Sequence, residues 1–250
     1  MRFVYSVFSI LILLSALNVS VVLASVPIVC EGSYDGHLQG ITTDGTENIF
    51  WSFTKTLVKT DLQGKISVKV RVDTHHGDLC FHQGKVYVAV NLGEFNKEPG
   101  KADSWVYVYD AENLQLLNRF AVPQVVHGAG GMDYRDGFFY VIGGLPEGYS
   151  ENYVYKYDPH FNFIQRRVIS SGYTLMGIQT ACFSKGCWWF GCYGNPRECI
   201  QADPEFKFIK RFKYDCSLGI TKFREGFFVA EGFEKYRGRI SFIESPLGGR

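Results

Sequence analysis

Residues 134–143 read YRDGFFYVIG, in which an aromatic residue and a turn ending in glycine precede a run of aromatic and β-branched residues. The same features return at residues 81–90, 183–192 and 223–232, with a degenerate first copy at Asp44-Gly45. Aromatic and β-branched residues favour strands, and a short turn with glycine between two such runs favours a hairpin. The repeat therefore predicts a unit that contains a tight antiparallel hairpin.

A second repeated feature is an acidic residue that closes a third strand. It stands at Asp61, Asp110, Asp158, Asp203 and Glu244. The four aspartates are spaced by 49, 48 and 45 residues, and each precedes a short turn and a fourth apolar run. No segment of ten or more residues shows a convincing amphipathic helix period. The predicted unit is four antiparallel strands joined by short turns.

Five such units fill the chain after residue 24, at about 45 residues each, which is the size of one blade of a β-propeller. The last unit ends at its third strand near Glu244, whereas Val26–Gly32 reads as a strand without a partner. The sequence predicts one all-β domain over residues 25–250, a five-bladed β-propeller whose last blade is closed by the N-terminal strand. A two-sheet sandwich would explain the strands but not the matched features of every unit.

The strings VYVYD at 106–110 and RDGFFYV at 135–141 resemble the broad superfamily of non-WD β-propellers. This superfamily includes NHL-repeat, gluconolactonase-like and glutaminyl-cyclase-like proteins, and the resemblance covers the whole chain after the first 24 residues. His37-Leu-Gln-Gly40 is similar to the start of the first blade in plant-type glutaminyl cyclases. The acidic and aromatic residues expected after it are missing, so the resemblance does not carry that activity over.

Residues 1–24 have the pattern of a secretory signal peptide. Arg2 precedes an apolar stretch centred on residues 10–17, and small residues before Ser25 suit a signal peptidase. An uncleaved anchor helix is the alternative, although Ser15 and Asn18 weaken it. We expect a secreted or periplasmic protein that does not bind a membrane after cleavage.

The composition narrows the range of partners. The chain has 26 Lys and Arg against 25 Asp and Glu, and 46% of its residues are hydrophobic. This balance argues against a basic nucleic-acid-binding protein and against a disordered chain. We expect a monomer that binds a small molecule or a glycan.

Seven cysteines suit an exported chain that contains disulfide bonds. Cys192 and Cys199 flank the turn-rich segment YGNPRE, so a bridge that closes this loop is one prediction. The odd number leaves at least one thiol unpaired within a monomer. The sequence has no Cys-x-x-Cys, which weighs against a thiolate zinc site.

The two faces of the predicted propeller differ in their loops. The glycine turns of one face are short and uniform, whereas the loops after the second strands are long and varied, at residues 91–104, 143–152, 192–199 and 231–238. Long variable loops on a rigid scaffold commonly carry function. We expect the binding face to be the one that these loops surround.

The segments that lead into the first strands on that face contain His37, His75 with His76, His127 and Gln179, of which His37, His76, His127 and Gln179 form the candidate polar centre. Neutral imidazole is the commonest metal ligand, so convergence at the axis would suit a divalent ion such as Zn, Mn, Fe or Ca. The set resembles, in composition, the metal site of oligogalacturonate-lyase-like propellers, which have more blades. Two alternatives stay open: acid–base chemistry without a metal, paired with Asp78, Asp133 or Tyr193, and a purely structural role.

These residues lead to a functional hypothesis of a propeller that binds a sugar or uronate in its central funnel. Metal-assisted hydrolysis or elimination is the sharper version, with His127, His76 and Tyr193 as catalytic candidates. Gln179, Glu231 and Arg197 are the candidates for binding. The alternative is a non-catalytic module that recognises a glycan or a protein. No Gly-x-Ser-x-Gly, P-loop or His-Glu-x-x-His string supports other common chemistries.

Overall fold

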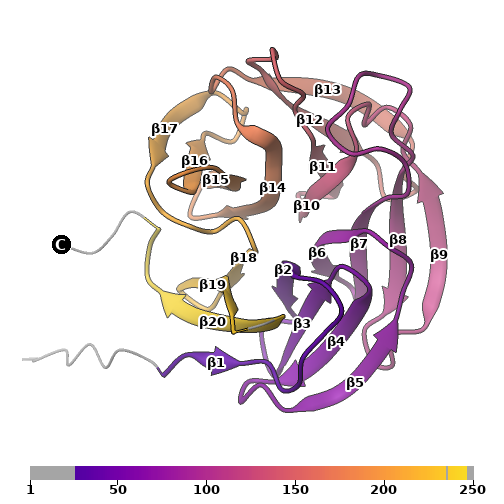
Figure 1. Cartoon of the computed structure of the whole chain (residues 1–250), viewed down its shortest axis with the longest axis vertical. Coiled ribbons are helices and arrows are strands. Elements are labelled where there is room, and N and C mark those ends of the chain that lie inside the picture. The colour runs from indigo at the N-terminus through magenta and orange to yellow at the C-terminus, as the bar shows by residue number, and fades with distance from the viewer. Residues whose placement is uncertain (1–25, 235, 247–250) are drawn as a thin grey trace, which may run out of the picture.

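The computed structural model describes residues 26–234 and 236–246, and within them twenty strands form five four-stranded antiparallel sheets arranged in a ring (Figure 1). The predicted five-bladed β-propeller is thereby confirmed. In this described part of the chain, no helix is long and apolar enough to cross a membrane. The predicted signal peptide lies outside the described residues.

Each blade runs outward from the axis in chain order. Blade 1 contains β2 (Leu38–Thr43), β3 (Asn48–Phe53), β4 (Thr56–Asp61) and β5 (Ile66–Arg71). Blade 2 contains β6 (His76–His82), β7 (Lys85–Asn91), β8 (Ser104–Asp110) and β9 (Leu116–Ala121). Blade 3 contains β10 (Ala129–Arg135), β11 (Phe138–Gly143), β12 (Asn152–Tyr157) and β13 (Phe163–Ile169). Blade 4 contains β14 (Leu175–Ser184), β15 (Cys187–Tyr193), β16 (Glu198–Ala202) and β17 (Phe208–Phe212).

Blade 5 is built from both ends of the described chain. It contains β18 (Ile220–Phe223), β19 (Gly226–Phe233), β20 (Arg237–Ile243) and β1 (Ile28–Val29). Ile28 faces Ile240 in this ladder, and the Cys30 amide donates to the Gly238 carbonyl at 2.9 Å. The predicted closure of the last blade by the N-terminal strand is confirmed, and it pairs the outer edge of β20.

The repeated sequence features have separate physical causes. In the hairpin turn between β6 and β7, Gln83 and Gly84 both have positive φ, as a type I′ turn requires. The repeated aspartates instead hold the turn between the third and fourth strands. The Asp61 carboxylate accepts the amides of Gln63 and Lys65, each at 2.9 Å. A short side-chain acceptor suits this role, because it satisfies turn amides that no strand pairs.

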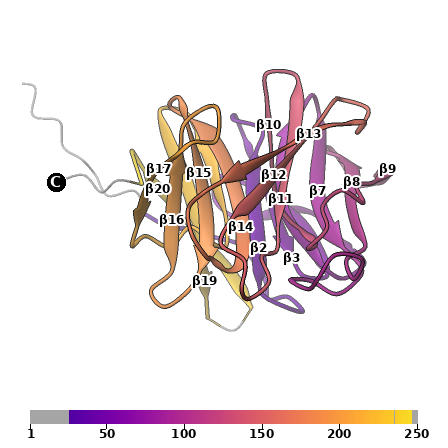
Figure 2. The ribbon, with the colours of Figure 1, turned by 90° about the horizontal axis from the view of Figure 1, so that it is seen from above.

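The innermost strands β2, β6, β10, β14 and β18 surround the axis, and Figure 2 shows the sheets side by side when the ring is viewed edge-on. A Cβ atom at Gly77 would lie 2.6 Å from the Gly130 carbonyl oxygen, so only glycine permits this approach. Backbone groups on the inner edge of β14 need partners other than a strand. Asp78 accepts the Ala181 amide at 3.0 Å, and thereby links blades 2 and 4 across the axis.

The spaces between the blades are filled by large apolar side chains, including Trp51, Trp188 and Tyr107, which are almost completely buried. Cys192 packs with the cluster between blades 3 and 4, whereas Cys199 packs with Cys216 between blades 4 and 5. Cys199 faces Gly191 in the ladder and Cys192 faces Glu198. Because neighbouring positions of a strand point to opposite faces, the two thiols are separated by the sheet. The predicted Cys192–Cys199 bridge is wrong, and all seven cysteines are free thiols.

Candidate functional site

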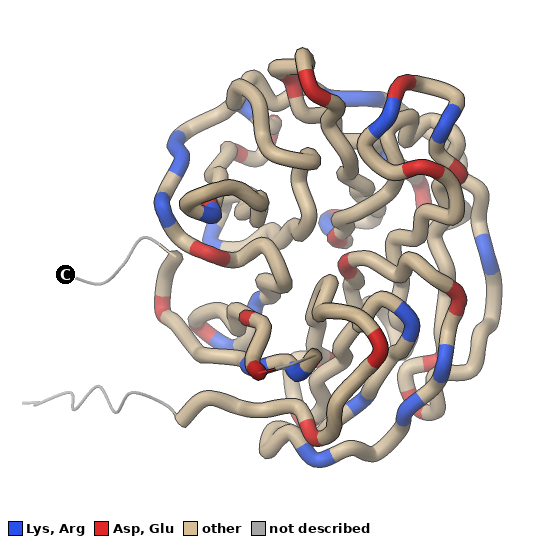
Figure 3. The backbone as a smooth tube through the Cα atoms, viewed as in Figure 1, with Lys and Arg blue, Asp and Glu red and all other residues tan. Residues whose placement is uncertain are grey.

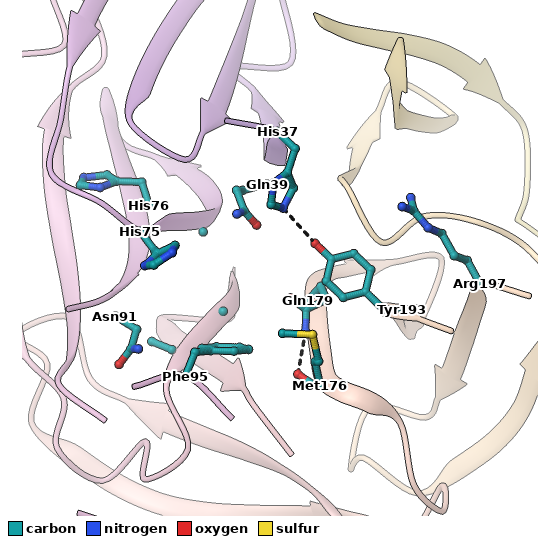
Figure 4. Close-up of a pocket in the computed structure, with 13 residues that line it drawn as sticks. His37, Gln39, His75, His76, Asn91, Phe95, Met176, Gln179, Tyr193 and Arg197 are labelled. Carbon is teal, nitrogen blue, oxygen red and sulfur yellow. Dashed lines mark hydrogen bonds between the residues drawn. The ribbon is translucent and has the colours of Figure 1, made fainter. Parts of the chain in front are cut away.

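A cavity of about 340 Å³ opens at the axis on the face that carries the long loops. Its walls come from blades 1 to 4, so residues far apart in the sequence meet there. The side chains that Figure 4 labels around it are His37, Gln39, His75, His76, Asn91, Phe95, Met176, Gln179, Tyr193 and Arg197. Its volume is within the range of small-molecule sites.

The cavity is lined by five of the predicted site residues, His37, His76, Gln179, Tyr193 and Arg197. The Tyr193 hydroxyl lies 3.5 Å from His37 Nε2 (Figure 4). The Arg197 guanidinium lies 5.5 Å from the centre of the Tyr193 ring and bonds to the Asp215 carboxylate at 2.9 Å. Gln179 Nε2 donates to the Met176 carbonyl at 2.7 Å, which fixes the direction of its side chain. Blades 1 and 4 thus place these polar groups at one opening.

The electrostatics of the cavity favour an acceptor-rich or anionic ligand. Among the described residues that line it there is an arginine and there are histidines, but no carboxylate. Desolvation, reinforced by the charge of Arg197, lowers the pKa of His37, so its imidazole is neutral at pH 7. Desolvation also raises the pKa of Tyr193, so its hydroxyl keeps its proton. The cavity therefore offers a cation, a phenol donor and a neutral imidazole.

His76 contributes to the wall of the cavity, but its ring points away from Gln179 and Tyr193 (Figure 4). Its Nδ1 donates to the Asp73 carbonyl at 2.6 Å, and its Nε2 accepts from the Tyr109 hydroxyl at 2.7 Å. Desolvation lowers the pKa of His76 to about 4, which keeps the ring neutral. Both ring nitrogens are engaged by the protein, so the contacts of His76 are those of a packing residue between blades 1 and 2.

His127 is buried beside the loop between β7 and β8. Its Nδ1 donates to the Lys97 carbonyl at 2.8 Å, and its own carbonyl accepts the Asn96 amide at 2.8 Å. The ring packs against Tyr149, with 5.0 Å between ring centres. These bonds hold the loop that places Phe95 in the cavity wall. His127 is therefore a positioning residue in this arrangement.

The remaining predicted residue, Glu231, lies on blade 5 and pairs with Arg239 at 2.8 Å, away from the residues that line the cavity. Ring nitrogens of His76 and His127 are engaged in hydrogen bonds within the chain. The predicted set of His37, His76, His127 and Gln179 therefore does not form one group of metal-ligand atoms that face a common point. Within residues 26–234 and 236–246, no three His, Cys, Asp or Glu side chains are placed to hold a metal ion. The prediction of a divalent metal rests on the sequence alone.

The sequence prediction assigned no role to several residues of the wall, namely Gln39, Phe95, Met176 and His75, although His75 stands with His76 in a predicted lead-in segment. Gln39 and His75 stand within two residues of predicted site residues, and the lead-in segments contained the signal for them. Phe95 lies in a long loop that was predicted only as a whole. Its ring packs against Gly130 in the cavity wall, and no sequence pattern near Phe95 predicts this contact.

Comparison with known proteins supports the fold and no finer assignment. No protein-family profile matches the chain, and no curated protein matches it. A chain of the nidogen/laminin complex is similar over 78% of this chain and 72% of its own length, with 10% identity and a TM-score of 0.50. The computationally designed protein Ika4 matches over 70% of this chain and 96% of its own, with 10% identity and a TM-score of 0.43. A protein of unknown function from Bacteroides caccae matches over 77% and 69%, with 12% identity and a TM-score of 0.45. At these identities the likeness concerns the architecture alone: the chain has the fold of a five-bladed β-propeller.

Proposed function

We propose that this propeller is an exported protein that binds a small sugar acid, such as a uronate, in the cavity at its axis. The observation that carries the proposal is the convergence of polar side chains from different blades on one cavity that has a cation but, among its described lining residues, no carboxylate. An anionic group entering such a site would gain a charge-assisted hydrogen bond from Arg197, which it would share with the Asp215 carboxylate behind the wall.

The wall supplies the contacts that a pyranose acid needs. Arg197 would bind the carboxylate, although it shares its charge with Asp215. Phe95 and Tyr193 offer aromatic faces on which the C–H face of a sugar ring can pack. The Gln179 carbonyl oxygen can accept from a hydroxyl group, since its amide nitrogen is already committed to Met176. Affinity would come from these few directed contacts in a preformed site.

One observation favours a catalytic version of this function. The neutral imidazole of His37 and the protonated Tyr193 hydroxyl lie 3.5 Å apart at the mouth. In an elimination, His37 Nε2 would take the proton from the carbon that bears the carboxylate. The electron pair would form a C=C bond as the C–O bond of the leaving group breaks, and Tyr193 would give its proton to the departing oxygen. Arg197 would stabilise the negative charge that develops on the carboxylate.

Titration calorimetry of the whole chain with galacturonate and with neutral galactose tests the binding function. We expect galacturonate to bind and galactose to bind at least about tenfold more weakly, because the charge-assisted contact is missing. Arg197→Gln should abolish the difference, whereas Arg224→Gln, an exposed arginine that does not line the cavity, should leave it unchanged. Equal affinity for both sugars in the unmodified chain would refute the proposal.

An assay for the ultraviolet absorbance of an unsaturated uronate, with oligogalacturonate as substrate, tests the catalytic version. Tyr193→Phe should remove turnover and change binding little, since the ring stays and only the proton donor is lost. Binding of galacturonate with no absorbance change would leave the non-catalytic module as the function.

A further inference from the structure

The outermost strands of blades 1 to 4 carry charge of one sign. The outermost strands of blades 1 to 4 contain Lys69, Arg71, Arg119, Arg166, Arg167, Lys210 and Arg211, and no Asp or Glu. We call this set the basic rim. The chain as a whole is almost balanced, with 26 basic and 25 acidic residues. The rim is therefore a segregation of charge that the overall composition does not reveal.

The side chains of the basic rim are accessible to a partner. All of them are exposed except Arg211, which is half-buried and bonds to Glu198 at 2.6 Å. Arg119 lies 4.8 Å from the centre of the Tyr107 ring, and Arg166 lies 4.5 Å from that of Tyr153. Aromatic rings orient a guanidinium group without neutralising it. These contacts hold the charges against the surface and leave them available.

The charges follow one another around the molecule. In Figure 3 the blue segments mark the outer arcs of the ring, which Figure 1 labels β17, β13, β9 and β5 in turn. Between β5 and β9, Arg71 and Arg119 line a common groove of about 430 Å³ at the junction of blades 1 and 2, together with one carboxylate, that of Asp73. The rim is thus a curved surface with repeated cationic groups rather than a single anion site.

Protection of sheet edges explains only part of this pattern. Charged side chains on an outer strand discourage pairing with another chain, and all four strands have an outer edge. Acidic side chains would repel another copy as well as basic ones do. Placing like charges along one rim also costs some stability through mutual repulsion. The uniform sign points to a partner of opposite charge.

We infer that the basic rim binds a flexible linear polyanion, an acidic polysaccharide that follows the curvature across several blades. A double-stranded nucleic acid does not suit this surface. Its persistence length is about 50 nm, whereas a chain of this size has a radius of gyration of only about 18 Å. A flexible chain with a charge on each sugar can meet successive cations without bending energy of that size. This inference does not depend on the ligand of the central cavity.

Fluorescence anisotropy with labelled heparin, a sulfated uronate polysaccharide, tests the inference on the whole chain. Labelled dextran serves as the neutral probe, and a 30-base-pair DNA duplex serves as the rigid one. We expect heparin to bind at low salt, with an affinity that falls steeply as the salt concentration rises. We expect no binding of dextran, and DNA binding at least about tenfold weaker than that of heparin. DNA binding as tight as that of heparin would overturn the choice of a flexible polysaccharide.

Two variants with the same loss of charge locate the interaction. The rim variant combines Lys69→Gln, Arg71→Gln, Arg167→Gln and Lys210→Gln. The control combines Lys85→Gln, Lys97→Gln, Lys101→Gln and Lys222→Gln, which are exposed lysines away from the outer strands. We expect the rim variant to lose at least about tenfold in heparin affinity and the control less than about twofold. Equal losses in the two variants, or no heparin binding by the unmodified chain at low salt, would overturn the inference. Arg197→Gln should retain heparin binding. A failure of the proposed galacturonate site and a failure of the proposed heparin site can therefore be told apart.

Discussion

Asp133 predicts a dependence of stability on pH that can be measured directly. Its carboxylate accepts the Phe183 amide at 2.6 Å and the Tyr134 amide at 2.8 Å, while desolvation raises its pKa to about 7. In the unfolded chain an aspartate loses its proton near pH 4. Between about pH 4 and pH 7 the folded state therefore holds a proton that the unfolded state has released. The contribution of Asp133 to the free energy of unfolding falls over this interval by up to about 4 kcal/mol.

Urea unfolding of the unmodified chain and of Asp133→Asn, at intervals from pH 4.5 to pH 8, isolates this contribution. Other groups titrate in both proteins, including His76, whose lowered pKa makes stability rise with pH over part of the range. Subtracting the free energy of unfolding of one protein from that of the other cancels the contributions of these shared groups. We expect this difference to change by about 2–4 kcal/mol in favour of the variant as the pH rises to 7, and to level off above it. A difference that does not vary with pH would refute the reasoning, and Asp35→Asn, made at an exposed aspartate, controls for the loss of a carboxylate as such.

Three further outcomes follow from the contacts described above. His76→Ala should lower the free energy of unfolding by about 2–4 kcal/mol, measured in urea, because a buried ring and two hydrogen bonds are lost; galacturonate affinity should change less than about twofold. His127→Ala should weaken galacturonate binding about threefold to tenfold by loosening the loop that carries Phe95, with faster amide hydrogen exchange in residues 92–101; unchanged exchange there would contradict the positioning role. Alkylation of the unfolded, unreduced chain followed by mass spectrometry should label both Cys192 and Cys199, whereas a peptide that joins them would contradict the ladder register.

The fold could be predicted from the sequence because its signals are local and repeated. Each glycine turn and each aspartate acts within a few residues of itself, so one copy is enough to recognise the others. The unpaired strand at Val26–Gly32 then required a partner, and β20 supplies it.

The site was predicted less completely because its chemistry depends on the orientation of each side chain, which the sequence pattern does not specify. His75 and His76 are neighbours, yet the ring of His76 packs between two blades while His75 lies at the cavity. The error at Cys192 and Cys199 has the same origin, since closeness along a loop says nothing about which face of the sheet each thiol occupies.

The pairing of β1 with β20 also constrains how this protein is made. Ile28 and Ile240 are 212 positions apart, so β1 leaves the ribosome long before its partner strand β20 is synthesised. Contacts of such long sequence separation form slowly, because the entropy of the intervening loop is lost before they stabilise anything. The sheets of blades 1 to 4 contain only neighbouring strands and can assemble during synthesis. Circularisation is therefore the late step, and substitutions in β1 should speed the opening of the ring more than they slow the folding of blades 1 to 4.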